Sequence, residues 1–208
     1  MCNKYSNIYG CLGIHPESVE KSTEEDFKYI EENLKHPKVV AVGEIGLDYY
    51  WTQDNKLLQQ EWFKKQLELA KKYDKCVVVH SRDAIKDTYE LLKESNIKKM
   101  DIHCFSSSLE MANKFIRLGA RIGIGGVLTF KNSEKLKEIV KAVDIEYLLL
   151  ETDSPYLTPE PYRGKKNEPF NVYYVAQKIA ELKHESVEVV IEKTTKNAIE
   201  QFDLPIVL

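Results

Sequence analysis

Four positions that could bind a metal ion each follow a short, apolar, β-branched segment of the sequence. They are Glu44, His80, His103 and Asp153, the last with Glu151 two residues before it. Imidazole nitrogens and carboxylate oxygens are ligands that divalent cations prefer in proteins. Together they suit metal-assisted hydrolysis, in which a bound cation makes water a nucleophile near neutral pH.

Each of these residues also has a structural explanation when it is taken alone. A histidine at a strand end is often held by ordinary hydrogen bonds. Glu44 could cap a backbone group, and Asp153 could hold the turn before Ser154-Pro155. Four such residues after four different buried strands favour a shared site, because a buried carboxylate is costly unless it is paired or metal-bound.

Other chemistries fit the sequence poorly. There is no G-x-S-x-G elbow for a serine nucleophile. Cys104 follows His103 directly, and neighbours on a strand point to opposite faces, so they cannot form a dyad. The run Gly123–Leu128 lacks the third glycine of a dinucleotide-binding fingerprint and indicates a tight turn instead.

Alternating strands and helices must position the candidate ligands. We expect strands at Tyr9–Ile14, Val39–Gly43, Cys76–Val79, Lys99–Ile102, Arg121–Ile124 and Tyr147–Leu150. We expect helices at Thr23–Leu34, Asn55–Tyr73, Ala84–Lys93, Ser108–Leu118, Ser133–Ala142, Asn171–Leu182 and Ser186–Phe202. The first helix follows a capping box Ser22–Glu25, Ser107 with Glu110 forms a similar start, and Pro155–Phe170 is expected to be a long functional loop.

Continuous apolar strands in this alternation indicate a parallel sheet that is buried on both faces. A doubly wound open sheet and a (β/α)₈ barrel both fit. In a barrel the carboxyl ends of all strands meet at one face, where active sites form.

The composition describes one globular domain over residues 1–208. Hydrophobic residues make up 43% and charged residues 30%, and the formal net charge is −3. That charge argues against a broad basic surface that coats nucleic acid, and leaves a local site for a phosphate-bearing substrate. The four cysteines form no C-x-x-C pair, the polar N-terminus is no signal sequence, and no apolar run could span a membrane. We therefore expect a reduced, cytoplasmic protein.

Seven segments resemble signatures of the TatD family, in the family's order and over nearly the whole chain: Gly13–Pro16, Val42–Tyr50, Val78–Ala84, His103–Ser106, Ile122–Asn132, Leu149–Leu157 and Pro161–Pro169. The resemblance implies an amidohydrolase-like (β/α) barrel of the TIM type. It also implies one or two divalent cations (Mg²⁺, Mn²⁺ or Zn²⁺) and hydrolysis of DNA phosphodiesters from the 3′ end. The expected partner is DNA, as single strands or 3′ ends, and the expected state is a monomer.

The same resemblance implies a role for each matching residue. Glu44 resembles a carboxylate that bridges two metals, and His80 and His103 resemble the ligands that complete one site. Asp153 resembles the residue that contacts the other metal and the attacking water, so Glu44 and Asp153 are the catalytic candidates. The substrate-binding candidates are His15, Arg82 and Arg163, with Lys165 and Lys166 as weaker ones. The loop around Arg163 could equally be a solvated charged surface.

The sequence departs from the family at its start. The family begins with a strand carrying His-x-His, and none occurs among His15, His36, His80, His103 and His184. We therefore expect the chain to lack roughly the first two βα units of the barrel, through a truncated gene model or a real loss. Three functions stay open: a 3′-directed deoxyribonuclease, another ester hydrolase such as a D-aminoacyl-tRNA deacylase, and a remnant without turnover.

Overall fold

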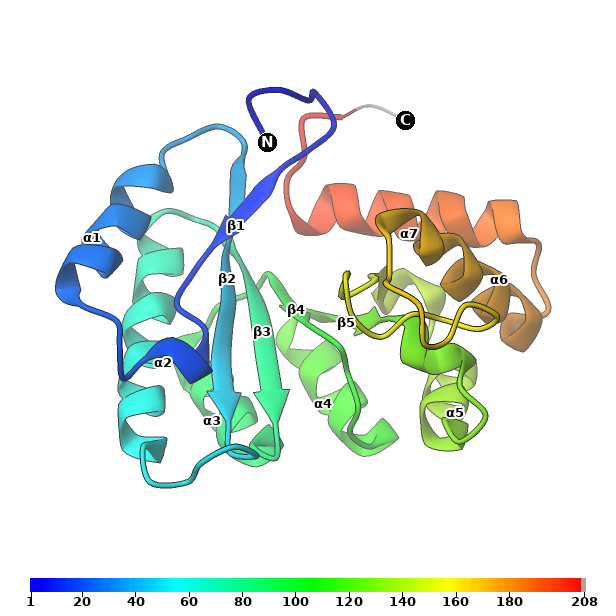
Figure 1. The fold of residues 1–208 in the computed structure, drawn as a ribbon, viewed down its shortest axis with the longest axis horizontal. Coiled ribbons are helices and arrows are strands. Elements are labelled where there is room, and N and C mark those ends of the chain that lie inside the picture. Colours follow the sequence, from blue (N-terminus) through cyan, green and yellow to red (C-terminus); the bar gives the residue numbers. More distant parts are fainter. Residues whose placement is uncertain (207–208) are drawn as a thin grey trace. The chain divides into compact units, whose positions relative to one another are not determined.

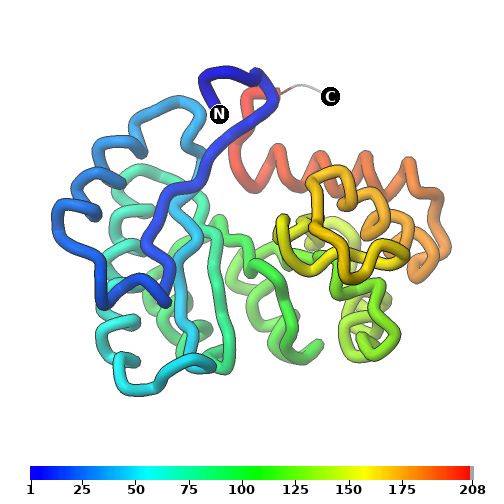
Figure 2. The backbone as a smooth tube through the Cα atoms, in the orientation of Figure 1, coloured from blue at the N-terminus to red at the C-terminus, as the bar shows by residue number. Residues whose placement is uncertain are grey.

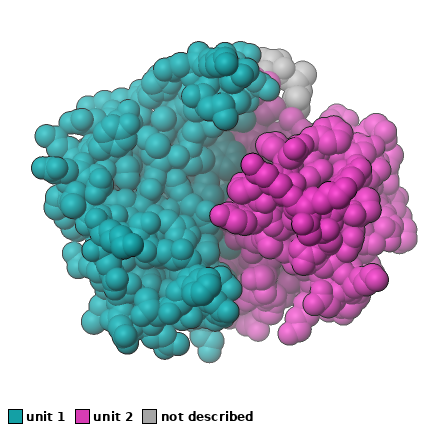
Figure 3. Space-filling view, in the orientation of Figure 1, with its two compact units in different colours: residues 1–102, 201–204 teal, residues 103–200, 205–208 magenta. Residues whose placement is uncertain are grey.

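The computed structural model describes residues 1–206, which form two compact units. The first unit comprises Met1–Ile102 with Gln201–Leu204, and the second comprises His103–Glu200 with Pro205 and Ile206 (Figure 3). Both units alternate parallel strands with helices, which confirms the α/β class. A single domain over residues 1–208 stays a prediction.

The first unit contains four parallel strands that pair in chain order. They are β1 (Gly10–Leu12), β2 (Val39–Asp48), β3 (Cys76–Arg82) and β4 (Met100–Ile102). The connections contain η1 (Pro16–Ser18), α1 (Glu24–Asn33), α2 (Lys56–Lys72) and α3 (Ile85–Ser95), and α2 packs along β2 (Figure 1). The core between helices and strands is built from fully buried side chains: Ile45, Leu47, Phe63, Leu67, Leu92 and Met100.

The second unit contains the parallel pair β5 (Ala120–Ile124) and β6 (Leu148–Leu150). Its helices are α4 (Leu109–Leu118), α5 (Glu134–Ala142), α6 (Val172–Lys183) and α7 (Val187–Gln201), with the short η2 (Gly126–Thr129), η3 (Ile145–Tyr147) and η4 (Pro169–Asn171). The tube in Figure 2 follows the long irregular segment between β6 and η4, which confirms a loop there, and its functional role stays a prediction. Phe115, Ile122, Ile124 and Leu128 are fully buried in this unit.

The strands β2 and β3 are longer than the sequence predicted. Both were expected to end just before Glu44 and His80, but β2 runs on to Asp48 and β3 to Arg82. In β2 the buried Ile45 and Leu47 alternate with Glu44, Gly46 and Asp48, so the strand keeps one apolar face while the other becomes polar. Glu44 and His80 therefore lie within their strands rather than after them, which corrects the prediction.

Two predicted N-capping residues are wrong by one position. Helix α1 is capped by Thr23, whose side chain accepts from the Asp26 backbone N–H, while the Asp26 carboxylate accepts from the Thr23 N–H (2.8 Å). The capping box therefore begins at Thr23, one residue after Ser22. Helix α4 is capped by Ser108, which accepts from the Met111 N–H (3.2 Å), and not by Ser107. In each case the neighbouring hydroxyl was an equally good candidate by residue type.

Helix α2 holds two backbone segments of the first unit through buried glutamines. The Gln66 amide accepts from the Ile14 N–H (2.6 Å) and donates to the Ile14 carbonyl (3.1 Å). The Gln59 amide makes the same pair of bonds to the N–H and carbonyl of Asp48, both at 2.8 Å. Gln59 and Gln66 are two turns apart on one face of the helix. They fix the backbone next to His15 and at the end of β2.

Replacing Gln66 with alanine is expected to lower the free energy of unfolding by about 2–4 kcal/mol. The substitution leaves a buried N–H and a buried carbonyl of Ile14 without their partner, and each such loss costs about 1–3 kcal/mol. Urea denaturation measures the change. The matched control is Gln177→Ala on an exposed face of α6, where less than about 0.5 kcal/mol is expected. Equal stability of the two variants would contradict the role of Gln66.

Within residues 1–206, no helix is both long and apolar enough to cross a membrane. The four cysteines all lie in this described part and no disulfide joins them. The Cys76 thiol is buried and accepts from the amide of Gln201 (3.5 Å), a residue that also belongs to the first unit. Burial raises the pKa of this thiol, so Cys76 is an unreactive core residue.

Candidate metal centre

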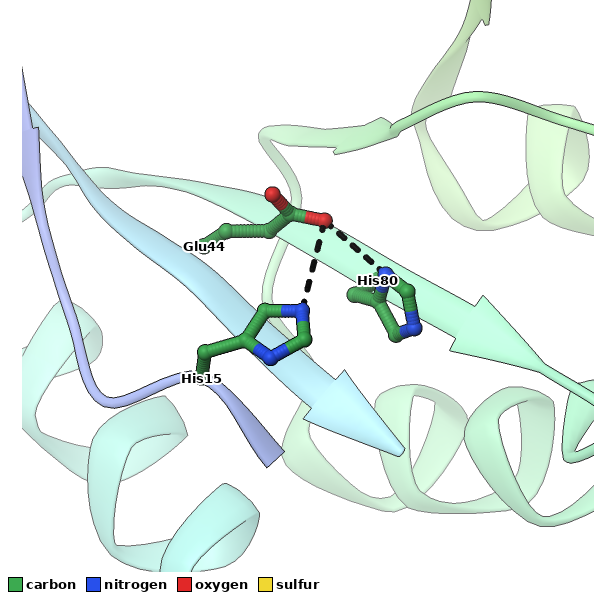
Figure 4. Close-up of side chains that lie close together, drawn as sticks. All are labelled: His15, Glu44 and His80. Atoms are coloured by element: carbon green, nitrogen blue, oxygen red, sulfur yellow. Dashed lines mark hydrogen bonds and ion pairs between the residues drawn. The ribbon is translucent and has the colours of Figure 1, made fainter. Parts of the chain in front are cut away.

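Glu44, His15 and His80 converge in the first unit (Figure 4). Glu44 Oε1 lies 3.0 Å from His80 Nδ1 and 4.0 Å from His15 Nε2. The two imidazole rings meet edge to face, with centroids 4.6 Å apart. The potential ligand atoms of the three residues lie within 4.8 Å of one another, which is close enough for one cation to reach them all.

Asp48 supports His80 from the side opposite Glu44. Its Oδ2 lies 2.8 Å from His80 Nε2, and its side chain is only 1% exposed. Its Oδ1 accepts from the Tyr50 N–H (3.0 Å), and its own backbone is held by Gln59. A carboxylate on the second ring nitrogen fixes the orientation of a metal-binding histidine and raises its basicity. His80 is therefore oriented with Nδ1 toward Glu44.

The electrostatics of the two histidines differ. Burial lowers the pKa of His80, but its contacts with the carboxylates of Glu44 and Asp48 outweigh burial, and the net shift is upward. Burial and the neighbouring His80 lower the pKa of His15 below its usual value. A cation would replace the proton that His80 holds at acid pH, so metal binding should weaken in acid.

His15 is better suited to donate a hydrogen bond than to bind a cation. Its Nδ1 accepts from the Glu17 N–H (3.3 Å) at the start of η1. A neutral imidazole that accepts at Nδ1 carries its proton on Nε2, and this is the nitrogen nearest Glu44. An N–H donor beside a candidate metal ligand fits the substrate-side role expected for His15, which stays a prediction.

Replacing Asp48 with asparagine is expected to weaken binding of Zn²⁺ or Mn²⁺ between about 10- and 100-fold. The substitution keeps the size of the side chain but removes the charge that orients and polarises His80, and loss of such outer partners typically has this effect. Calorimetric titration with each metal measures the affinity.

Asp54→Asn, in the exposed loop after β2, is the control for a nearby loss of negative charge. We expect it to bind metal like the wild type. If both variants lose affinity equally, the net charge of this region matters and the contact with His80 does not.

His103, Glu151 and Asp153 form a second group, in the second unit. His103 follows β4, and the two acidic residues follow β6. Glu151 Oε2 lies 2.8 Å from His103 Nδ1, and Asp153 Oδ1 lies 3.5 Å from His103 Nε2. The imidazole thus has a carboxylate at each ring nitrogen, as His80 has.

Glu151 is unusual because it is a buried carboxylate without hydrogen-bond donors. Its side chain is 11% exposed, and within residues 1–206 neither oxygen has a hydrogen-bond partner. The 2.8 Å contact with His103 Nδ1 is an ion-pair contact. Gly125 makes room for this carboxylate, because a Cβ there would lie 3.2 Å from Glu151 Oε1. A buried carboxylate without donors is costly, and a bound cation would remove that cost.

The structure brings the predicted ligands together in two pairs, Glu44 with His80 and His103 with Asp153. Since the pairs belong to different units, a shared ion cluster of all four stays a prediction. Asp48 and Glu151 were not assigned as ligands from the sequence. A signal existed for Asp48, because it is four residues after Glu44 on β2 and even offsets along a strand share a face. Glu151 and Asp153 lie beyond the end of β6, so strand alternation does not place them on one face.

The two predicted substrate arginines are exposed and lie over aromatic rings. The Arg82 guanidinium is 3.6 Å from the centre of the Tyr50 ring, and the Arg163 guanidinium is 3.8 Å from that of Phe130. Stacking on a ring holds a guanidinium in place and leaves its N–H edge open to a phosphate. Contact of either arginine with substrate stays a prediction.

The chain is similar to known proteins over nearly its whole length. Residues 1–203 match a family model described as TatD related DNase. The chain is 44% identical over 200 residues to YabD of Bacillus subtilis, covering 95% of this chain and 78% of that protein, and 38% identical over 200 residues to YcfH of Escherichia coli K12, covering 95% and 75%. Both carry the description uncharacterized metal-dependent hydrolase.

Solved structures give the same result for the fold. The crystal structure of YjjV, a TatD homologue from Escherichia coli K12, matches with a TM-score of 0.91 and 32% identity, covering 98% of this chain and 80% of that one. A TatD family hydrolase from Entamoeba histolytica matches with a TM-score of 0.81 and 28% identity, covering 97% and 78%. The family model matches from residue 1, and the absence of the first two βα units stays a prediction.

Proposed function

The chain belongs to the TatD family of metal-dependent hydrolases, and on this premise we propose that it hydrolyses phosphodiester bonds at the 3′ ends of DNA. The observation that supports the proposal most strongly is the convergence of Glu44 with two histidines within 4.8 Å. No serine or cysteine nucleophile is needed for such a site, because water can be the nucleophile. Single-stranded DNA is the proposed partner.

The residues fit a divalent cation, and Mg²⁺, Mn²⁺ and Zn²⁺ all suit mixed imidazole and carboxylate ligands. Glu44 and His80 would hold a cation in the first unit, and His103 with Asp153 or Glu151 would hold one in the second. The buried Glu151 oxygens support this, since they have no hydrogen-bond donor within the described residues. When bound, a divalent cation lowers the pKa of a water molecule and offsets negative charge on the phosphate.

The remaining residues have roles that follow from their chemistry. Asp153 is 36% exposed, so its carboxylate can accept a proton from the attacking water. The Nε2–H of His15 can donate to a phosphate oxygen. Arg82 and Arg163 can each offset charge on a phosphate through their exposed N–H groups. Cytoplasmic location and a monomeric state stay predictions.

An oligonucleotide assay tests the proposal. Single-stranded DNA with a label at the 5′ end is incubated with Mg²⁺, Mn²⁺ or Zn²⁺, and with a chelator as control. We expect a ladder of products that shorten from the 3′ end and that the chelator abolishes. Cleavage of a D-aminoacyl-tRNA ester with intact DNA would replace the proposal by another ester hydrolase. Binding of metal without turnover on either substrate would identify a non-catalytic protein.

A further inference from the structure

Two large aromatic side chains stand exposed in the loop that follows β2. Tyr50 is 53% exposed and Trp51 is 66% exposed. Their rings meet at nearly a right angle, 85°, with centroids 4.9 Å apart. Two adjacent exposed aromatic rings are a feature of binding sites more than of ordinary surface.

Arg82 and Asp48 hold this aromatic pair in place. The Arg82 guanidinium lies 3.6 Å from the Tyr50 ring centre and 5.5 Å from that of Trp51. The Tyr50 N–H donates to Asp48 Oδ1 (3.0 Å), and the Tyr49 N–H donates to the Arg82 carbonyl (2.9 Å). The loop that carries the two rings is therefore hydrogen-bonded to both β2 and β3.

The pair adjoins the candidate metal ligands of the same unit. Arg82 follows His80 by two residues on β3, so the two side chains share a face, roughly 7 Å apart along the strand. Asp48 contacts both His80 and the Tyr50 backbone. A phosphate held near His80 would thus bring a neighbouring nucleotide to the aromatic pair.

We propose that Tyr50 and Trp51 stack on a nucleobase of a single-stranded substrate, while Arg82 contacts a phosphate beside it. This inference rests on the proposed function and adds the stacking site to it. The size of the patch favours a base, since a stable protein interface buries about 800 Å² per partner and two side chains cannot supply that. The net charge of −3 argues against a broad basic surface, so local contacts such as base stacking and the Arg82 guanidinium would have to hold the strand.

Tryptophan fluorescence gives a direct readout. The chain has two tryptophans, and Trp62 is buried at 6% exposure, so a base stacking on the surface would quench Trp51. The protein is titrated with hexathymidylate and with an abasic hexamer of the same charge, with a chelator present to prevent cleavage. We expect quenching by hexathymidylate and an affinity roughly tenfold above that for the abasic strand.

Variants separate stacking from other effects. Trp51→Ala should reduce the preference for bases to about threefold or less, and Trp51→Phe should keep most of it. Leu57→Ala, at an 82% exposed position in α2, is the control for loss of an exposed apolar side chain nearby. Equal affinity of the wild type for the two strands, or an unchanged preference in Trp51→Ala, would overturn the inference.

The two proposals fail in different ways. Base-dependent quenching without cleavage in the nuclease assay would support the stacking site and contradict the proposed nuclease activity. Cleavage by a protein that binds the abasic strand as tightly as hexathymidylate would support the nuclease activity and contradict the stacking site.

Discussion

Glu44→Ala is expected to lower kcat on an oligonucleotide by at least about a thousandfold. Glu44 is the carboxylate that lies between His15 and His80, at 4.0 and 3.0 Å. Of the two residues that would hold a cation in the first unit, its loss would leave only His80. A cation contributes several kcal/mol of transition-state stabilisation, and about 4 kcal/mol corresponds to a thousandfold in rate. The assay is the rate of 3′ shortening at saturating Mn²⁺.

The control is Glu90→Ala, an exposed glutamate on α3 whose ion pair with Lys93 spans 3.9 Å. It removes the same charge from the same unit and should keep wild-type activity. A Glu44→Ala enzyme with more than about a hundredth of wild-type activity would show that this carboxylate is not a catalytic ligand, because a loss of up to about a hundredfold is within the range of an outer partner.

Glu44 should also affect the pH dependence of stability in the metal-free protein. The pKa of His80 is raised in the folded state, so its charged form stabilises the fold below pH 6.5, the ordinary histidine value. This contribution is lost as the pH rises through the raised pKa. With a chelator present, acidification should therefore raise the Tm of the wild type by more than it raises the Tm of Glu44→Ala. Identical pH profiles would contradict the coupling between the two residues.

The second large effect is expected for Gly46→Ala, which should lower the free energy of unfolding by more than about 4 kcal/mol. Gly46 has φ of +143° and pairs with His80 across β2 and β3. A Cβ there would lie 2.0 Å from the His80 carbonyl oxygen and 2.9 Å from its carbonyl carbon. Backbone atoms cannot give way as a flexible side chain can, so the two strands must separate at the histidine.

Thermal and urea denaturation measure the loss, and metal titration shows whether His80 is displaced. Gly164→Ala is the matched control: its φ is also positive, at +82°, but nothing lies within 4 Å of the added Cβ. It should cost only the backbone strain of about 1–2 kcal/mol. Comparable losses in the two variants would mean that conformation alone matters at Gly46 and that the contact with β3 does not.

The sequence predicted the order of the strands and helices, and nearly all their bounds to within two residues, because apolar segments and helical periodicity alternate clearly along the chain. The predicted end was wrong for β2, because this strand is apolar on both faces before Gly43 and on only one face after it. Polar Glu44 was taken as the end of an apolar strand, whereas the buried Ile45 and Leu47 continue it. Choosing between adjacent hydroxyls at a helix start also needs the backbone conformation, since Thr23 and Ser22 have similar side chains.

For the candidate site, residue types and strand ends were the basis for predicting Glu44, His80, His103 and Asp153, which the structure brings together in two pairs. They could not show which side chains contact one another. The support of His80 by Asp48 depends on side-chain geometry at the end of β2, and the state of Glu151 depends on which donors reach it after folding. Similarly, the ring contact between Arg82 and Tyr50 joins residues far apart in the chain. Such relations arise from tertiary packing and have no local pattern.

The two glutamines of α2 make the spacing along that helix part of the architecture of the site. One residue inserted between Gln59 and Gln66 would turn everything beyond it by about 100°. Gln66 would then point away from Ile14 and lose its two hydrogen bonds, while Gln59 would keep its hydrogen bonds to Asp48. Length changes in this span are therefore not tolerated as they would be in a loop, even though much of the outer face of α2 is open to substitution. The number of residues between the two glutamines is therefore fixed by the two backbone segments to which they bind.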